Sequence, residues 1–211
     1  MDYRTLAAEG ASEVIEKKSR FIGEAVRVNT PEEAEQYIAG VRKHYYDARH
    51  HCFAYIAGEP GTPDEILRCS DDGEPSGTAG RPMLEILTGR DLHRCLLVVT
   101  RYFGGTLLGT GGLVRAYSAA ARDAVEDAGA VCVRDGVELC ITCTYTQLGR
   151  IQYRFAEDGI RITDTEYAAD VKVHVTVPAD AVSGIEKLVT ELTDGTGSCE
   201  TVGRSLYEEP V

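Results

Sequence analysis

A cluster of glycines between an apolar run and a helical pattern constrains this chain more than any other feature. Five glycines fall within nine positions, at Gly104, Gly105, Gly109, Gly111 and Gly112. The run CLLVVT before them predicts a strand that is buried on both faces. The alanine-rich pattern after them predicts a helix from about Leu113 to Ala128 that ends at Gly129. The segment therefore requires a buried strand that leads through a glycine turn into a helix.

The rest of the first 134 residues carries further strand and helix signals. SEVIEKK and SRFIGEAVRV predict two strands around a Lys-Lys-Ser turn, and HCFAYIAG predicts another strand. Thr30 followed by Pro31 is typical of a helix start, and RPMLEILTGR predicts a second helix. Residues 58–80 read as one long loop, with a short apolar piece at residues 66–67. Loops of that length are usually functional or disordered.

The second half of the chain follows a simpler order. VELCITCTY and ADVKVHVTVP alternate apolar and polar residues, as half-buried strands do. Helical stripes, IRITDTEYA and SCETVGRSLY complete the order β-α-β-β-α-β, which is that of a ferredoxin-like domain. We therefore expect an α+β protein with an N-terminal domain at residues 1–134 and a ferredoxin-like domain at residues 135–211.

Charge is divided unequally between the two halves of a chain whose net charge is −12. Residues 1–134 hold 16 Lys/Arg and 20 Asp/Glu, net −4, and residues 135–211 hold 6 and 14, net −8. Binding to nucleic acid depends on neutralising phosphates. Any contact with RNA would therefore need a local basic patch in the first half.

The seven cysteines and the N-terminal segment indicate a reducing compartment. An odd number of scattered cysteines, without an apolar secretory segment, predicts free thiols in the cytoplasm. Cys140 and Cys143 form a C-x-x-C, but residues three apart on a strand face opposite ways and cannot share a metal. We expect no metal, no cofactor and no membrane span, and the sequence predicts no particular oligomeric state.

The glycine segment itself is the first candidate site. The free amides and the dipole of a helix N-terminus attract anions, which suggests a site for phosphate or RNA. Arg101 and Arg115 flank the glycines, and Arg81 and Tyr102 complete the expected surface. The segment lacks the Lys-Ser/Thr of a Walker A loop and the third glycine of a dinucleotide-binding loop. The alternative is structural: the glycines let the helix pack closely on its sheet.

An acidic loop, SDDGEPSGTAGRP, and the segment DARHHC supply the other candidates. Asp71, Asp72 and Glu74 could hold Mg²⁺ or Ca²⁺, although a solvated turn explains them equally well. The remaining loop candidates are hydroxyls or an imidazole: His50, Ser76 and Thr78. A Cys-His nucleophile within DARHHC is disfavoured because neighbouring strand residues point to opposite faces.

Four segments, in this order, resemble the IMPACT/YigZ family of bacterial proteins and eukaryotic translation regulators: KKSRFIGEA, DARHHCFAYIAG, SDDGEPSGTAGRPML and VVTRYFGGTLLGTGGLVRAYSAAA. The resemblance implies an N-terminal domain of the ribosomal protein S5 domain 2-like type and a ferredoxin-like second domain. Both are similar to modules of the translocation elongation factor. In the eukaryotic branch, the related domain belongs to a protein that restrains a kinase pathway of translation initiation through a partner protein. That branch has an extra N-terminal partner-binding domain, which we do not expect in this chain, so the resemblance does not imply the same partner. The family supplies no agreed catalytic residues.

Three functions follow from these observations. The first is a cytosolic, non-catalytic factor that acts on translation and contacts RNA phosphate or a ribosome-associated protein through the glycine-arginine surface. The second is a small-molecule or nucleotide-binding enzyme, by analogy with metabolite kinases of the same broad fold class. The third is a protein-interaction module whose acidic second domain meets a basic partner.

Overall fold

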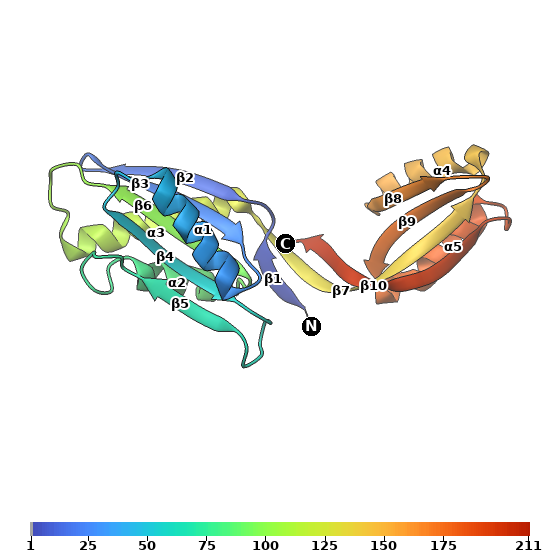
Figure 1. Cartoon of the computed structure of the whole chain (residues 1–211). Helices are drawn as coiled ribbons and strands as arrows, with labels where there is room; N and C mark the ends of the chain where they lie inside the picture. Colours follow the sequence, from blue (N-terminus) through green and yellow to red (C-terminus); the bar gives the residue numbers. More distant parts are fainter. Residues whose placement is uncertain (1) are drawn as a thin grey trace. The chain divides into compact units, whose positions relative to one another are not determined.

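The structure is a computed structural model that describes residues 2–211, and these residues form two compact units (Figure 1). One unit holds residues 3–132, and the other holds residues 133–209. Each is described on its own. Within residues 2–211, no helix combines the length and the apolar character needed to cross a membrane.

The first unit is built on a wholly antiparallel five-stranded sheet in the order β2-β3-β6-β4-β5. Its strands are β2 (Gly10–Glu16), β3 (Ser19–Arg27), β4 (His50–Ala57), β5 (Ile66–Ser70) and β6 (Cys95–Tyr102). The expected hairpin joins β2 to β3, and both turn residues, Lys17 and Lys18, have positive φ (47° and 67°). A two-residue hairpin turn of this kind matches the twist of its strands. A further strand, β1 (Tyr3–Leu6), does not belong to this sheet.

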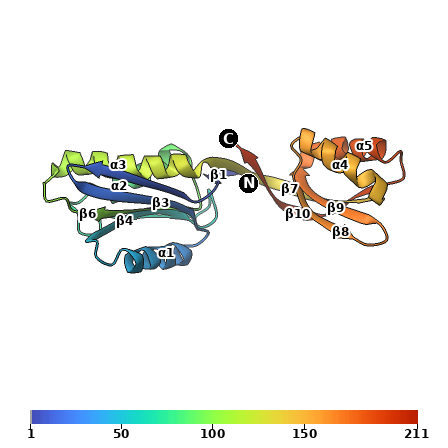
Figure 2. The ribbon, with the colours of Figure 1, turned by 90° about the horizontal axis from the view of Figure 1, so that it is seen from above.

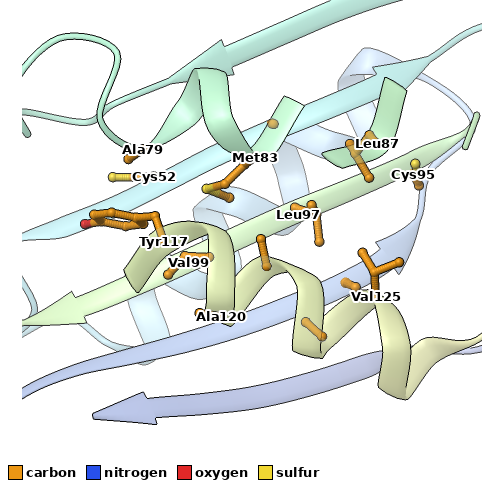
Figure 3. Packing of buried hydrophobic residues seen from close by; sticks show 14 of the residues in the cluster. Cys52, Ala79, Met83, Leu87, Cys95, Leu97, Val99, Tyr117, Ala120 and Val125 are labelled. Atoms are coloured by element: carbon orange, nitrogen blue, oxygen red, sulfur yellow. The ribbon is translucent and has the colours of Figure 1, made fainter. Parts of the chain in front are cut away.

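Helices cover both faces of this sheet (Figure 2). The helix α1 (Pro31–His44) packs on one face, over a core that includes Ile38 and Tyr55. The helices α2 (Gly80–Gly89) and α3 (Gly109–Ala128) pack on the opposite face. Their apolar side chains meet those of β4 and β6 in the main core of the unit, where Tyr117 of α3 lies beside Cys52 and Ala79 (Figure 3). This is the expected S5 domain 2-like fold.

The close packing of α3 on the sheet depends on glycines outside the glycine segment. A Cβ atom at Gly23 would lie 2.7 Å from the carbonyl oxygen of Ala120, and one at Gly10 would overlap the backbone of Ala124. Gly104 allows a different close approach, since a Cβ there would collide with the backbone of Lys18 in the turn between β2 and β3. A Cβ at Gly109 would meet nothing within 4 Å. Neither Gly104 nor Gly109 therefore brings α3 against the sheet, which is the role that the structural interpretation gave to the segment.

Two expectations about secondary structure in this unit were wrong: where α3 begins, and the absence of a strand in residues 58–80. The helix α3 begins at Gly109 instead of Leu113, so Gly111 and Gly112 are helical. Glycine costs about 1 kcal/mol in a helix relative to alanine, and tertiary packing of the buried Leu113 and Ala116 outweighs that cost here. The expected loop at residues 58–80 also contains a strand, β5, which pairs along β4 with Ser70 opposite Phe53.

The second unit has the predicted ferredoxin-like fold. Its elements are β7 (Ala130–Cys143), α4 (Tyr145–Glu157), β8 (Ile162–Tyr167), β9 (Val171–Pro178), a 3₁₀ turn (Ala179–Ala181), α5 (Val182–Leu192) and β10 (Ser198–Pro210). The sheet runs β10-β7-β9-β8, and α4 and α5 both cover one face (Figure 2). Phe155 and Val189 pack against the alternating valines of β9 in its core. The alternation read from the sequence therefore predicts this unit well.

Candidate functional site

The N-terminal turn of α3 is left open by its neighbours. The first four amides of a helix have no carbonyl partner within the helix. Thr30 caps α1 and Thr144 caps α4 through side-chain oxygens, whereas α3 has no side-chain cap and no acidic residue in its first turn. Gly109 and Gly111 are exposed. The turn thus presents uncompensated N–H donors and the positive end of the helix dipole to the surroundings.

A pocket of ≈ 430 Å³ opens beside this turn. Its lining comes from the end of β6, the loop that leads into α3, the start of α3, and the segments around His50 and Glu74. The lining residues are Arg49, His50, Glu74, Pro75, Arg101, Phe103, Leu107, Leu108, Gly109, Thr110 and Leu113. Apolar side chains and a few polar groups are the usual composition of a small-molecule site.

A buried ion pair forms the polar part of the lining. Arg101 Nη1 donates to Glu74 Oε1 over 2.5 Å, and the two side chains are only 6% and 4% exposed. The guanidinium of Arg101 also lies over the rings of Phe21 and Phe103, 5.3 and 5.6 Å from their centroids. The two charges offset each other, so the pair adds hydrogen-bonding groups to the pocket without adding net charge.

Tyr117 of α3 holds the carboxylate of this pair in place. Its hydroxyl donates to Glu74 Oε1 over 2.8 Å, and its ring meets Phe21 edge-to-face. Burial, together with the neighbouring Cys52 and Glu74, raises the pKa of Tyr117, so the hydroxyl keeps its proton. Glu74 therefore accepts two hydrogen bonds on one oxygen from two different elements of the unit.

Arg101 keeps one donor without a partner. Its Nε is buried and makes no hydrogen bond with any of residues 2–211. Its Nη2 has only a long contact of 3.5 Å with Ser19 Oγ. A buried donor left without an acceptor costs about 1–3 kcal/mol. Arg101 lines the pocket, so an acceptor from water or a ligand that reached this Nε would be stabilising.

The rim of the pocket carries Arg49 and His50. Arg49 is exposed and makes no ion pair among residues 2–211, so its charge is available. His50 lies directly opposite Arg101 in the register of β4 and β6, and its Nδ1 is 2.8 Å from the carbonyl oxygen of Asp72. Because a carbonyl only accepts, Nδ1 carries the proton, and Nε2 is left to face other groups.

The acidic loop is a structural element. Asp71 accepts hydrogen bonds from the amides of Gly77, Ala79 and Gly80 at 2.8–2.9 Å, so its carboxylate caps the N-terminus of α2. Burial raises the pKa of Asp71, but the three amide bonds outweigh it and hold that pKa below its ordinary value. Asp71 therefore remains charged near neutral pH and fixes the loop that carries Glu74.

The idea that Asp71, Asp72 and Glu74 hold a divalent cation was wrong, because their carboxylates do not converge. Asp72 accepts from the amide of His51 and from Arg42, both at 2.7 Å, while Glu74 faces Arg101. Within residues 2–211, no three His, Cys, Asp or Glu side chains are grouped as a metal site requires. The carboxylates instead fasten the loop to three separate elements.

The structure brings some of the expected site residues together and separates others. His50, Glu74, Arg101 and Gly109 line the pocket. Arg115 is exposed one turn into α3, and its Nη1 would lie 3.6 Å from a Cβ at Gly111. The amides of residues 109–111, with Arg49 and Arg115 beside them, form one region, which we call the α3 anion site.

The other expected residues have different surroundings. Tyr102 points to the opposite face of the sheet from Arg101, where its hydroxyl donates to Asp47 over 2.7 Å. That hydrogen bond raises the pKa of Tyr102 to about 12. Arg81 is exposed on α2 and pairs with Glu85, and Arg101 is buried, so neither is a free surface cation.

The small loop residues are also accounted for. Thr78 is buried and donates to the carbonyl oxygen of Pro75 over 2.6 Å, whereas Ser76 is exposed.

Gly105 has a positive φ of 85°, which a turn requires, and the Gly104 amide donates to Ser19 Oγ over 3.1 Å. Gly112 is buried against Leu108. These residues shape the loop and do not themselves line the pocket.

The sequence interpretation missed the aromatic and apolar lining. Phe103 lies two positions after Arg101, and side chains two apart share a face when the extended path continues. That spacing would have selected Phe103 over Tyr102. The sequence pattern does not distinguish Arg49, Leu107 and Leu108, which also line the pocket, from other loop residues.

An S5 domain 2-like unit followed by a ferredoxin-like unit defines a two-domain α+β protein of the IMPACT/YigZ kind. Residues 17–125 match the Impact N-terminal domain, and residues 141–196 match a domain of unknown function (DUF1949). The chain belongs to the IMPACT family, which confirms the resemblance noted in its sequence.

Relatives match over most of their length. The chain is 38% identical to the IMPACT family member YvyE of Bacillus subtilis (strain 168), over 99% of this chain and 95% of that protein. It is 38% identical to the IMPACT family member YigZ of Escherichia coli (strain K12), over 85% of this chain and 88% of that protein. A crystal structure of a hypothetical protein, 35% identical, superimposes with a TM-score of 0.60 over 95% of this chain and 97% of that one.

Proposed function

We propose that the protein is a cytosolic, translation-associated regulatory factor that binds RNA phosphate at the α3 anion site. The observation that carries the proposal is the open first turn of α3, which has no side-chain cap and no acidic residue. Beside it lie Arg49 and Arg115, which make no ion pair within residues 2–211. Helix N-termini with free amides are established phosphate sites in proteins. Arginine adds charge-assisted hydrogen bonds to phosphate oxygens.

The charge distribution confines such binding to this region. The chain is strongly acidic, and residues 135–211 carry a net charge of −8. A polyanion is repelled by that unit, so contact with RNA is restricted to the local positive groups of the first unit. We expect modest affinity that falls steeply with salt, because the phosphate contribution is electrostatic.

The translational part of the proposal comes from the family resemblance. Eukaryotic proteins of the IMPACT type act on translation, and both units are similar to modules of the elongation factor that moves along the ribosome. Both kinds of protein work on the translation apparatus. RNA phosphate is therefore the first anion to test.

Retention of single-stranded RNA across a salt series tests the proposal. We expect binding at low salt that weakens with added salt. An Arg49→Glu/Arg115→Glu variant should bind much less, and the slope of log K against log salt should flatten by about 0.7 for each lost phosphate contact. Arg122→Glu is the matched control, since Arg122 is an exposed arginine two turns further along α3.

Any of three results would overturn the proposal. One is the absence of RNA retention at low salt. Another is retention that the double variant and the Arg122→Glu control affect equally, because the charge at the α3 anion site would then have no special part. Capture of a ribosomal protein without RNA would also overturn it, in favour of a protein partner.

A further inference from the structure

We propose that the pocket beside the α3 anion site binds one nucleotide unit, with the base inside the pocket and the phosphate at the amides of Gly109 and Thr110. The inference rests on the proposed function in one respect, since the phosphate occupies the same helix end. It goes further by assigning a ligand class to the pocket. The base-binding part depends on observations that RNA phosphate contact does not require.

The first observation is the size and apolar character of the pocket. A volume of ≈ 430 Å³ lies within the range of sites that hold one small molecule. Five apolar residues line it: Pro75, Phe103, Leu107, Leu108 and Leu113. A phosphate ion alone would leave these side chains uncovered, so the pocket fits a ligand that also has an apolar part.

The second observation is the exposure of two of those side chains. Phe103 is 50% exposed and Leu107 is 83% exposed, although both lie beside a polar, cationic rim. Leaving apolar surface in water is unfavourable, and a flat ring that stacks on Phe103 would cover it. Aromatic side chains next to a positive groove are the usual stacking platforms for nucleic-acid bases.

The third observation is the polar part of the lining. Glu74 is a carboxylate and only accepts hydrogen bonds, while the buried Arg101 has an Nε donor without a partner among residues 2–211. A ligand that matches both must present donors and acceptors close together. The edge of a nucleobase does so, whereas a fatty acid or a hydrocarbon ring would leave these groups unmatched.

The fourth observation is the balance of charge around the pocket. The charges of Glu74 and Arg101 compensate each other at 2.5 Å, and Arg49 adds one positive charge at the rim. The uncapped first turn of α3 adds the positive end of its dipole. A group with negative charge is therefore favoured at the α3 end, and a neutral ring is favoured over Phe103.

Calorimetric titration of the full chain tests this inference. The ligands are AMP, GMP and UMP, the matching nucleosides, and inorganic phosphate. We expect at least one nucleoside monophosphate to bind at least tenfold more tightly than its nucleoside and than phosphate. Phe103→Ala and Arg49→Ala should each weaken that binding at least tenfold. Both residues are on the surface, so these variants should fold.

Matched controls separate binding from general surface effects. Tyr46 is an exposed aromatic residue outside the pocket and Arg122 is an exposed arginine outside it. Tyr46→Ala and Arg122→Ala should leave nucleotide binding unchanged. Equal loss in the controls, or phosphate binding as tight as nucleotide binding, would overturn the inference.

A second arm distinguishes a free nucleotide from the end of an RNA strand. A short single-stranded RNA with a 5′-phosphate is compared with the same strand ending in a 5′-hydroxyl. Tighter binding of the phosphorylated strand than of the mononucleotide supports an RNA end as the source. Tighter binding of the mononucleotide supports a free nucleotide.

The two proposals fail in different ways. If RNA is retained and depends on Arg115, but mononucleotides do not bind and Phe103→Ala has no effect, the pocket inference is overturned and the proposed function stands. If mononucleotides bind through Phe103 but RNA is not retained, the proposed function is overturned and the pocket inference stands.

Discussion

Arg101 and Glu74, 27 residues apart in the sequence, form an ion pair whose N–O distance is 2.5 Å and whose side chains are almost fully buried. The pair ties the end of β6 to the loop that precedes α2. Tyr117 ties the same carboxylate to α3. Three elements that surround the pocket are thus held by one carboxylate, so the shape of the pocket depends on Glu74.

Breaking this pair should destabilise the first unit strongly. Arg101→Met leaves the carboxylate of Glu74 buried without its cation, which typically costs about 3–5 kcal/mol. The double variant Arg101→Met/Glu74→Gln removes both charges and keeps an acceptor for Tyr117, so it should recover much of that loss. Urea unfolding of the wild type and both variants measures these differences in the free energy of unfolding. A single variant that loses less than about 1 kcal/mol would show that the pair is not buried in solution.

Asp71 should make the stability of the first unit sensitive to acid. The pKa of Asp71 is lowered in the folded protein, while an unfolded Asp has a pKa of about 3.9. Its contribution is therefore complete above about pH 4 and is lost as the pH falls through the lower, folded pKa. Asp71→Ala should cost about 1–2 kcal/mol near pH 7.

The pH dependence of that difference is the check. Urea unfolding is measured for wild type, Asp71→Ala, and the control Asp64→Ala, which removes an exposed side chain. The gap between wild type and Asp71→Ala should shrink as the pH falls below about 4. A gap that stays constant down to pH 2 would mean that the charge of Asp71 does not support the loop.

Two glycines of the glycine segment should respond in opposite directions to alanine. Gly104→Ala would place a Cβ in the backbone of Lys18, so it should unfold or strongly destabilise the first unit. Gly111→Ala places a Cβ in open space within a helix, 3.6 Å from Arg115 Nη1, and should stabilise by about 0.5–1 kcal/mol. Thermal unfolding of the two variants measures this contrast, and equal effects would refute the distinction.

The seven free cysteines should differ in their reactivity. Burial raises the pKa of Cys95 to about 12 and also raises that of Cys52, and both thiols lie in the main core. The thiolate is the reactive form. Alkylation at pH 8, followed by mass spectrometry, should label the exposed Cys69 well before Cys52 or Cys95. Labelling of Cys95 as fast as Cys69 would contradict the packing of this core.

The sequence predicts the architecture because the pattern of apolar residues reports burial directly. The alternating valines of residues 171–177 belong to a strand with one buried face, and their period alone places them in β9. The start of α3 could not be read this way. Glycine is a poor helix former, so Thr110, Gly111 and Gly112 read as loop until the packing of the following turn is known.

The candidate site is harder to predict than the fold. An arginine after an apolar strand gives no sign that it is buried, and its partner Glu74 lies in a loop whose path depends on tertiary contacts. From the sequence alone, Arg101 is therefore expected on the surface, and Glu74 is one of several loop candidates without an assigned partner. The helix end can be selected from the sequence as a candidate region, because Gly109 and Arg115 are local to it, and its binding of an anion stays a prediction.

The backbone amide signals of the α3 turn test the central claim most directly. An NMR titration of the ¹⁵N-labelled chain with single-stranded RNA at low salt follows each amide separately. We expect the signals of Gly109, Thr110 and Gly111 to shift first and to move together, and to return when salt is raised. If those signals stay fixed while amides of α4 or β9 shift instead, RNA binds elsewhere and the α3 anion site is not its binding site.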